Sequence, residues 1–313
     1  MGDTTGKARR ASILGLGLMG GSLAWSLRRA GWEVRAYDRD RSCLQYAAER
    51  KIIDGGYNGI ATAVAGAQLV CLAVPPAEVL PLGREIAPHL APGCIVTDVV
   101  SVKEGIVSGM MDVLPDTVYY VGGHPMAGSE QGGIRAASPY LLVGAPYILT
   151  PVSTTAPHAL DFMVELVKTV RARPLLMPPA EHDYWVAGMS HLPYITAVAL
   201  CHLVARLEGD EDTPANIAAR GFRDTTRIAS SDPLLWRDIC LENREQILPL
   251  LRTYRGIIAE MEMVLEKGEK DGLSRYFATG KSLRDSLFEG GKPDGFASAT
   301  GSPAAGEDPG SGR

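Results

Sequence analysis

Short apolar runs alternate with longer amphipathic stretches over the first half of the chain. The apolar runs cover residues 12–16, 33–37, 68–73, 95–98, 118–121, 145–149 and 174–177, and apolar residues recur at helical spacing in 20–30, 42–50 and 156–170. Strands that alternate with helices are typical of βα units that build a parallel sheet. The pattern therefore predicts an α/β domain with a Rossmann-type, doubly wound parallel sheet, whose ligands bind beyond the carboxyl ends of the strands.

The pattern changes after Pro178 and Pro179. Strand-like runs disappear, and residues 180–207, 242–267 and 273–288 show the 3.6-residue apolar period of helices. From residue 290 the chain is mostly Gly, Pro, Ala and Ser, with too little apolar surface to offset the entropy of ordering it. We therefore expect the α/β domain over residues 1–178, an all-helical domain over 179–289 and a disordered tail over 290–313.

The composition is that of an ordinary globular protein. Hydrophobic residues make up 46% of the 313, and 31 basic against 36 acidic side chains give a net charge of −5. Neutralising nucleic-acid phosphates needs a basic surplus, so we expect no nucleic-acid partner, and any anion site must be a local cluster. We recognise no signal peptide and no uninterrupted run of 18 apolar residues, so we expect a cytoplasmic protein without a membrane partner.

The five cysteines lie in apolar surroundings, with no CxxC pair and no metal-ligand spacing to the histidines. We expect them to be reduced core residues, and we expect no metal site.

A glycine-rich motif lies between the first predicted strand and the first predicted helix. In this place Gly15 permits a tight turn, Gly17 lets backbone N–H groups approach a pyrophosphate, and Gly20 permits close packing of helix on strand. The N-terminus of the helix adds free N–H donors and a partial positive charge. We expect a dinucleotide here, with contacts from Gly15, Gly17, Leu18, Met19, Gly20, Val74 and Pro75.

An acidic residue follows the second predicted strand, 18 residues after Gly20. This residue, Asp38, can accept hydrogen bonds from the two hydroxyls of an adenosine ribose, and its charge repels a 2′-phosphate. NAD is therefore favoured. Arg39 and Arg41 could instead hold that phosphate, so NADP remains the alternative cofactor.

A histidine in residues 121–130, VGGHPMAGSE, follows the fifth predicted strand at the ligand-binding edge. Glycines on both sides of His124 leave room for a ligand, and Ser129 and Glu130 add polar groups. Histidine is the side chain best suited to take a proton near neutral pH, as the oxidation of an alcohol by NAD requires. Taken alone, a histidine in this place is more often structural.

Ser101 ends the fourth predicted strand on the same edge. It could orient the imidazole of His124 or contact the nicotinamide end of the cofactor. It could also cap a helix that begins at residue 102, and the two roles are compatible.

Arg220, Arg223 and Arg227 share one face if their segment is helical. Such a row is usually solvated or paired, and Asp224 is available as a partner. In an acidic protein the row is also the best candidate for binding carboxylates. His191 lies in an apolar stretch that a proline interrupts, so it is either a core residue or faces a cavity at a bend.

Together these motifs resemble the prephenate and arogenate dehydrogenase (TyrA) family of tyrosine biosynthesis. The resemblance extends from about residue 11 to 288 and is most specific in ILGLGLMGG (13–21), DVVSVK (98–103), GHPMAGSE (123–130), SHLP (190–193) and GFRDTTRIASSDPLLW (221–236). It implies an NAD-dependent oxidative decarboxylation of prephenate. A hydride leaves C4 of the substrate, the ring carboxylate leaves as carbon dioxide, and an aromatic ring forms.

The resemblance also implies roles for individual residues. His124 accepts the proton of the C4 hydroxyl, Ser101 is its orienting neighbour, and Arg227 binds the ring carboxylate. The other implied substrate residues are His191, Ser129, Trp236, the acidic pair Glu130 and Asp224, and Arg223, where some relatives have lysine. The helical domain forms a homodimer in the family, so Arg223 and Asp224 could serve the partner chain.

Three alternatives remain open. The substrate could be arogenate, which differs from prephenate by an amino group in place of a keto group. A β-hydroxyacid dehydrogenase also has a GLGxMG segment, but it needs a lysine early in its second domain, and no lysine lies between Lys168 and Lys267. A non-catalytic NAD sensor would have no use for His124 and an arginine row.

Overall fold

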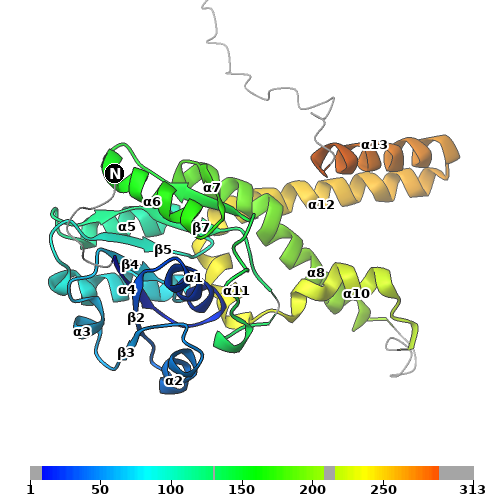
Figure 1. The fold of residues 1–313 in the computed structure, drawn as a ribbon. Coiled ribbons are helices and arrows are strands. Elements are labelled where there is room, and N and C mark those ends of the chain that lie inside the picture. The colour runs from blue at the N-terminus through cyan, green and yellow to red at the C-terminus, as the bar shows by residue number, and fades with distance from the viewer. Residues whose placement is uncertain (1–8, 130, 208–215, 289–313) are drawn as a thin grey trace, which may run out of the picture. The chain divides into compact units, whose positions relative to one another are not determined.

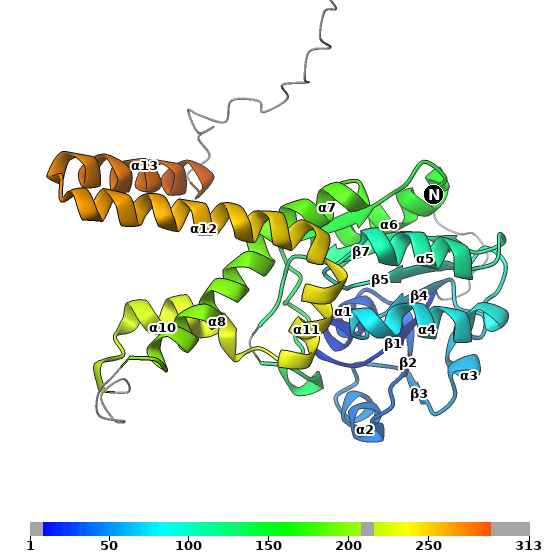
Figure 2. The same ribbon diagram turned by 180° about the vertical axis from the view of Figure 1, so that it is seen from behind.

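The structure is a computed structural model that describes residues 9–129, 131–207 and 216–288. The chain divides into two compact units, residues 1–251 and 252–313. Figures 1 and 2 show the fold from opposite sides, with all the strands of the described residues in the first unit.

A six-stranded parallel sheet forms the core of the first unit. Its strands are β1 (Arg10–Leu14), β2 (Glu33–Tyr37), β3 (Gly55–Tyr57), β4 (Leu69–Leu72), β5 (Ile95–Asp98) and β6 (Tyr119–Tyr120), in the order β3-β2-β1-β4-β5-β6. The connecting helices are α1 (Leu18–Arg29), α2 (Arg41–Glu49), α3 (Ile60–Val64), α4 (Pro76–Ile86) and α5 (Glu104–Val113). The strand order reverses between β1 and β4, which confirms the predicted fold class and puts the ligand crevice after these two strands.

The remaining strands form a second sheet, where the sequence pattern predicts a continuation of the parallel one. Its strands are β7 (Gly122–Pro125), β8 (Pro146–Thr150) and β9 (Arg173–Leu176), and α6 (Pro157–Thr169) joins the last two. β7 runs antiparallel to β8, and β9 runs parallel to it. His124 therefore lies in a strand of the second sheet, and not in a loop after the first.

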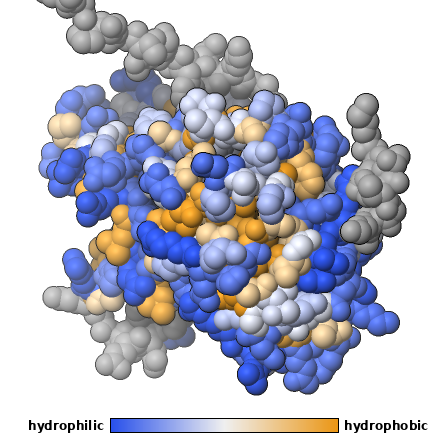
Figure 3. Space-filling model, turned by 90° about the vertical axis from the view of Figure 1, so that its left-hand side faces the viewer, coloured by the Kyte–Doolittle hydropathy of each residue, from blue (hydrophilic) through white to orange (hydrophobic). Residues whose placement is uncertain are grey.

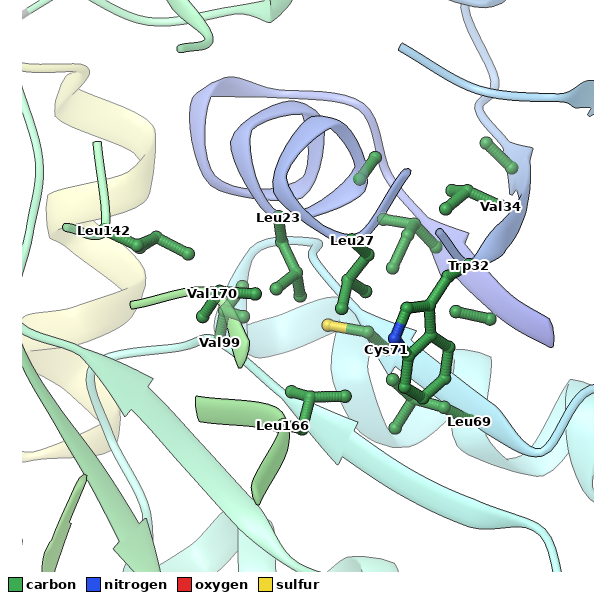
Figure 4. Close-up of a cluster of buried hydrophobic side chains, with 14 of the residues drawn as sticks. Leu23, Leu27, Trp32, Val34, Leu69, Cys71, Val99, Leu142, Leu166 and Val170 are labelled. Carbon is green, nitrogen blue, oxygen red and sulfur yellow. The ribbon is translucent and has the colours of Figure 1, made fainter. Parts of the chain in front are cut away.

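Helices cover both faces of the parallel sheet, so β4 is buried at every position. Leu69 and Cys71 belong to one hydrophobic cluster, whereas Val70 and Leu72, which point the other way, belong to another. Figure 4 shows the first cluster, with side chains of α1 and α6 against the two β4 residues. The molecular face shown in Figure 3 is largely hydrophilic, with hydrophobic residues gathered near its middle.

The second half of the chain is helical, as predicted. Its elements are α7 (Pro179–Val186), a π-helical turn (Ala187–His191), α8 (Leu192–Val204), α10 (Arg220–Thr226), a 3-10 turn (Arg227–Ser230), α11 (Pro233–Glu242), α12 (Arg244–Lys267) and α13 (Lys270–Phe288). In the second unit, the Tyr276 hydroxyl donates a hydrogen bond to the Ile257 carbonyl and so links α13 to α12. The predicted tail over 290–313 lies outside the described residues, and the boundary at residue 178 stays a prediction.

The helical run Pro179–Val204 has the length and mean hydropathy, 1.3, of a membrane span. It nevertheless carries His182, Asp183 and His191, which are buried and hydrogen-bonded to polar groups. Ionisable residues with such partners are typical of the core helix of a globular domain. Only 28% of the most apolar window is buried within the chain, so much of its surface is available to a partner.

All five cysteines are free, as predicted. The prediction that all of them are core residues is wrong. Cys71 and Cys94 are buried, whereas Cys201 on α8 is exposed in the single chain.

Candidate active site

The glycine-rich loop joins β1 to α1 at the point where the sheet order reverses. Gly15 has a φ of +98°, and a Cβ there would lie 2.3 Å from the Ala73 carbonyl oxygen. A Cβ on Gly20 would lie 2.0 Å from the Gly15 carbonyl oxygen, so the helix approaches the strand closely. A Cβ on Gly17 would meet nothing within 4 Å. Two glycines therefore shape the turn, and the third leaves open space at the start of α1.

Asp38 ties this loop to the end of β2. Its carboxylate accepts hydrogen bonds from the Leu16 N–H at 2.6 Å and the Asp40 N–H at 2.8 Å. A pocket of about 340 Å³ opens beside it, and the candidate cofactor residues that line it are Gly15, Gly17, Asp38, Arg39, Val74 and Pro75. Arg39 forms an ion pair with Glu78 at 2.9 Å. The predicted contacts of Leu18, Met19 and Gly20 lie at the adjoining start of α1, outside the lining of this pocket.

A buried polar cluster surrounds the end of β5. The carboxylate of Asp98 accepts hydrogen bonds from the Lys103 ammonium group, the Tyr120 hydroxyl and the Val100 N–H. It also lies 3.4 Å from the Gly123 N–H. Burial lowers the pKa of Lys103, and its ion pair with Asp98 opposes that shift. The cluster thus links β5 to the strand that carries His124.

His124 is almost fully enclosed, with 8% of its surface exposed. It lies in β7, whose backbone pairs with β8 at Ile148, and its Nδ1 lies 2.8 Å from Nε2 of His182. Burial lowers the pKa of His124 well below the usual 6.5, and the nearby His182, Lys103 and His191 add to the shift. The ring is therefore uncharged at neutral pH, which is the form that accepts a proton.

Asp183 connects α7 to the start of α5. Its carboxylate accepts the backbone N–H groups of Lys103 and Glu104, both at 2.8 Å, and lies 2.7 Å from Nδ1 of His182. Lys103 is the N-cap residue of α5 and makes no side-chain cap itself. The helix cap, one of the two possible roles of Ser101, is therefore not formed. The helix α5 begins at Glu104, and a carboxylate 80 residues away along the chain accepts its first N–H groups.

His191 ends the π-helical turn that precedes Pro193, where the sequence predicts a bend. The Asn243 side-chain amide, Nδ2, lies 3.1 Å from Nδ1 of His191 and 2.8 Å from the Asp183 carbonyl oxygen. Because that amide donates, Nδ1 of His191 accepts and Nε2 carries the proton. Nε2 is buried and has no hydrogen-bond partner. An unpaired buried donor of this kind is costly, and a ligand oxygen would satisfy it.

Trp236 of α11 lies beside this histidine. Its ring stacks on Tyr194, with 3.6 Å between ring centroids, and meets His191 edge to face at 6.0 Å. The two predicted substrate residues on separate helices, His191 and Trp236, are thus brought together.

Other predicted residues lie elsewhere or stay untested. Ser101 follows β5 but forms no hydrogen bond with His124, whose ring partner is His182. Ser129 is exposed and accepts the Gln131 N–H, and Glu130 lies outside the described residues. Arg223 and Asp224 on α10 and Arg227 on the following 3-10 turn are exposed in the single chain. Their roles toward a substrate stay predictions.

Sequence reasoning missed His182, Asp183 and Asn243 as members of the site. Residues 181–183 read Glu-His-Asp at the start of a strongly apolar helix, and buried ionisable residues of this kind were the available signal. No signal in the sequence pointed to Asn243, because its partners are 52 and 60 residues away along the chain.

The burial of His191 makes stability depend on pH. Its pKa is lowered by burial from 6.5 to about 4, so between these values the unfolded chain binds a proton that the folded chain does not. The free energy of unfolding is therefore highest above about pH 6.5. It falls by about 3 kcal/mol on account of His191 as the pH drops toward 4. Urea denaturation at several pH values should show a smaller loss for His191→Gln than for the unaltered protein. Equal losses in both proteins would contradict the shift.

The chain matches known protein families along most of its length. Residues 23–176 match the nucleotide-binding domain of prephenate dehydrogenase, and residues 178–279 match the dimerization domain of the same enzyme. It is 37% identical over 278 residues to the prephenate dehydrogenase of Bacillus subtilis (strain 168), which covers 88% of this chain and 75% of that protein.

Solved structures give the same result. The prephenate dehydrogenase of A. aeolicus, in complex with hydroxyphenyl propionate and NAD+, superposes with a TM-score of 0.84 at 30% identity, over 91% of this chain and all of that one. The arogenate dehydrogenase of Synechocystis superposes with a TM-score of 0.76 at 33% identity, over 89% of this chain and 99% of that one.

Proposed function

Because this chain belongs to the prephenate dehydrogenase family, we propose that it catalyses the NAD-dependent oxidative decarboxylation of prephenate to 4-hydroxyphenylpyruvate in tyrosine biosynthesis. The observation that carries the proposal is His124. It is a buried imidazole that burial keeps unprotonated, in the strand that adjoins the end of β5. A base with a lowered pKa is what removal of a hydroxyl proton at neutral pH requires.

The residues around the crevice fit a dinucleotide. Gly17 leaves the start of α1 open to a pyrophosphate, and Asp38 stands at the end of β2 where a ribose would bind. When bound, NAD accepts the hydride from C4 of the substrate. The fit supports contacts from Gly15, Gly17, Asp38, Arg39, Val74 and Pro75, with Leu18, Met19 and Gly20 at the adjoining helix start.

The chain's own residues then have distinct tasks. His124 accepts the proton of the C4 hydroxyl while the hydride leaves, and returns it to the ring oxygen once decarboxylation has made that oxygen a phenolate. His191 donates its unpaired Nε2–H to a substrate oxygen. Arg227 is the proposed partner of the ring carboxylate, since a substrate with two carboxylates needs cationic groups. Trp236 meets His191 edge to face and so stands beside the nitrogen that would bind the substrate.

Asp38 should decide between the two nicotinamide cofactors. Replacing it with asparagine removes a charge that repels a 2′-phosphate, so the ratio of kcat/KM with NADP to kcat/KM with NAD should rise at least about tenfold. Steady-state kinetics with both cofactors measure this ratio. Arg39→Gln tests the alternative, in which Arg39 holds the 2′-phosphate. Because Arg39 is already paired with Glu78, we expect it to change the ratio less than Asp38→Asn does. If Arg39→Gln changes the ratio more than Asp38→Asn does, the assignment is wrong.

The test of the proposed function is turnover by the purified protein, with NAD or NADP, against prephenate and against arogenate. We expect reduced cofactor to accumulate fastest with NAD and prephenate. Faster turnover of arogenate would favour the alternative substrate, and no turnover with either would contradict the proposal.

A cytoplasmic homodimer is part of the same proposal. The helical run Pro179–Val204 has an apolar surface that the single chain leaves uncovered, with Tyr184, Trp185, Met189 and Leu203 among its exposed side chains. The segment also falls within the part that matches a dimerization domain. A second copy of the chain would cover this surface, because exposed apolar patches mark interaction sites.

A further inference from the structure

Three buried side chains form an unbroken chain of hydrogen bonds from α7 to His124. The Asp183 carboxylate lies 2.7 Å from Nδ1 of His182, and Nε2 of His182 lies 2.8 Å from Nδ1 of His124. His182 has no exposed surface, and Asp183 has 3%. The proposed function assigns a task to His124 alone, so His182 and Asp183 have no role in it yet.

The direction of each hydrogen bond follows from the Asp183 end. Backbone N–H groups can only donate, and two of them, from Lys103 and Glu104, are aimed at the two oxygens of this carboxylate. The carboxylate is therefore an acceptor, and Nδ1 of His182 must donate to it. A neutral imidazole carries one N–H, so Nε2 of His182 holds a lone pair.

The same reasoning continues to the next ring. Because Nε2 of His182 accepts, Nδ1 of His124 must carry the proton and donate it. The lone pair of His124 is then on Nε2, the nitrogen that takes no part in this chain of hydrogen bonds. A positively charged His182 would reverse this order. Burial lowers the pKa of His182 below its usual value, although the hydrogen bond to Asp183 opposes that shift, and the Lys103 cation adds to it.

We propose that His182 and Asp183 are positioning residues that hold His124 in the tautomer whose Nε2 accepts the substrate hydroxyl proton. The proposal rests on the proposed role of His124 as the base. In the step itself the O–H bond of the substrate breaks and an Nε2–H bond forms, while the hydride goes to NAD. The positive charge that develops on the ring is stabilised through the Nδ1–H bond to His182 and, beyond it, the Asp183 carboxylate.

Replacing His182 separates this role from simple packing. His182→Leu removes the acceptor for the His124 N–H, and His182→Gln keeps an amide oxygen that can accept it. We expect kcat to fall at least about tenfold in the leucine variant, with the KM for NAD unchanged, and to recover most of its value in the glutamine variant. Equal kcat values in both variants, or a kcat close to that of the unaltered enzyme in His182→Leu, would overturn the proposal.

A double-mutant cycle gives a second test. If His182 acts only through His124, then His182→Leu should lower kcat no further in a protein that already carries His124→Asn. If the two losses in kcat multiply, His182 has a general structural role and the proposal is wrong.

A spectroscopic test does not depend on activity. With 15N-labelled histidine, NMR distinguishes a protonated ring nitrogen from a bare one, and the His124 signals are those that His124→Asn removes. We expect a bare Nε2 at His124 in the unaltered protein and partial protonation of that nitrogen in His182→Leu. A protonated Nε2 in the unaltered protein would overturn this inference even if the enzyme turns over. Failure of the proposed function would instead appear as absence of turnover by the unaltered protein.

Discussion

Replacing His124 with asparagine should lower kcat with prephenate by about 10²- to 10⁴-fold and leave NAD binding intact. The size is that of losing a general base. Asparagine keeps a side-chain N–H in a similar place and so retains one donor to His182, but it has no basic nitrogen to take the hydroxyl proton. The cofactor crevice lies after β1 and β4, and His124 is not among the residues that line its pocket.

The measurement pairs steady-state kinetics with a titration of NAD followed by protein fluorescence. Thermal unfolding of the variant checks that the fold is kept. A kcat close to that of the unaltered enzyme would remove His124 from its proposed role. A parallel loss of NAD affinity would indicate that the substitution disturbs the sheet and not the chemistry.

Replacing Asp98 with alanine should lower the free energy of unfolding by about 3 to 5 kcal/mol. The change removes the only carboxylate that the described residues pair with Lys103, whose side chain has no exposed surface. It also leaves the Tyr120 hydroxyl without its acceptor. Removing one partner of a buried ion pair costs this much because the other charge stays buried and uncompensated.

Urea denaturation measures the effect, and an exposed ion pair provides the control. Lys168 and Glu165 form such a pair on α6, with 57% and 68% of their side chains exposed, so Lys168→Ala should change stability little. A loss for Asp98→Ala no larger than that of the control would mean that the buried pair is not needed for stability. Because typical domains are stable by only about 5 to 15 kcal/mol, the variant should also unfold at a lower temperature.

The parts of the fold that depend on local apolar pattern could be predicted from the sequence. The predicted strands 33–37 and 95–98 agree with β2 and β5. Buried Val34 and Ala36 alternate with partly buried residues in β2, and β5 opens on the buried apolar pair Ile95 and Val96. β3 and β7 were missed since they read Gly-Gly-Tyr and Gly-Gly-His-Pro, which have no apolar alternation. The strand that carries His124 is held by pairing with β8 and by Asp98, and neither is visible in its own residues.

The candidate site also contains residues that the sequence predicts and residues that it does not. Gly15, Gly17 and Asp38 could be found because their spacing follows from one βαβ unit. For His182 and Asp183 the only signal was their place at the start of an apolar helix, since their roles come from hydrogen bonds to residues 58 and 80 positions away. Arg227 was found from its spacing to Arg220 and Arg223, and it lies on the 3-10 turn that follows α10.

The attachment of Asp183 to the start of α5 has a consequence for how such enzymes can be rearranged. The first turn of α5, a helix of the α/β part, is completed by a side chain from the helical part, so the two parts are not interchangeable modules. A chimeric enzyme could take residues 103–104 from one relative and residue 183 from another. It would have to keep these hydrogen bonds, or both the start of α5 and the His182 ring would lose a partner.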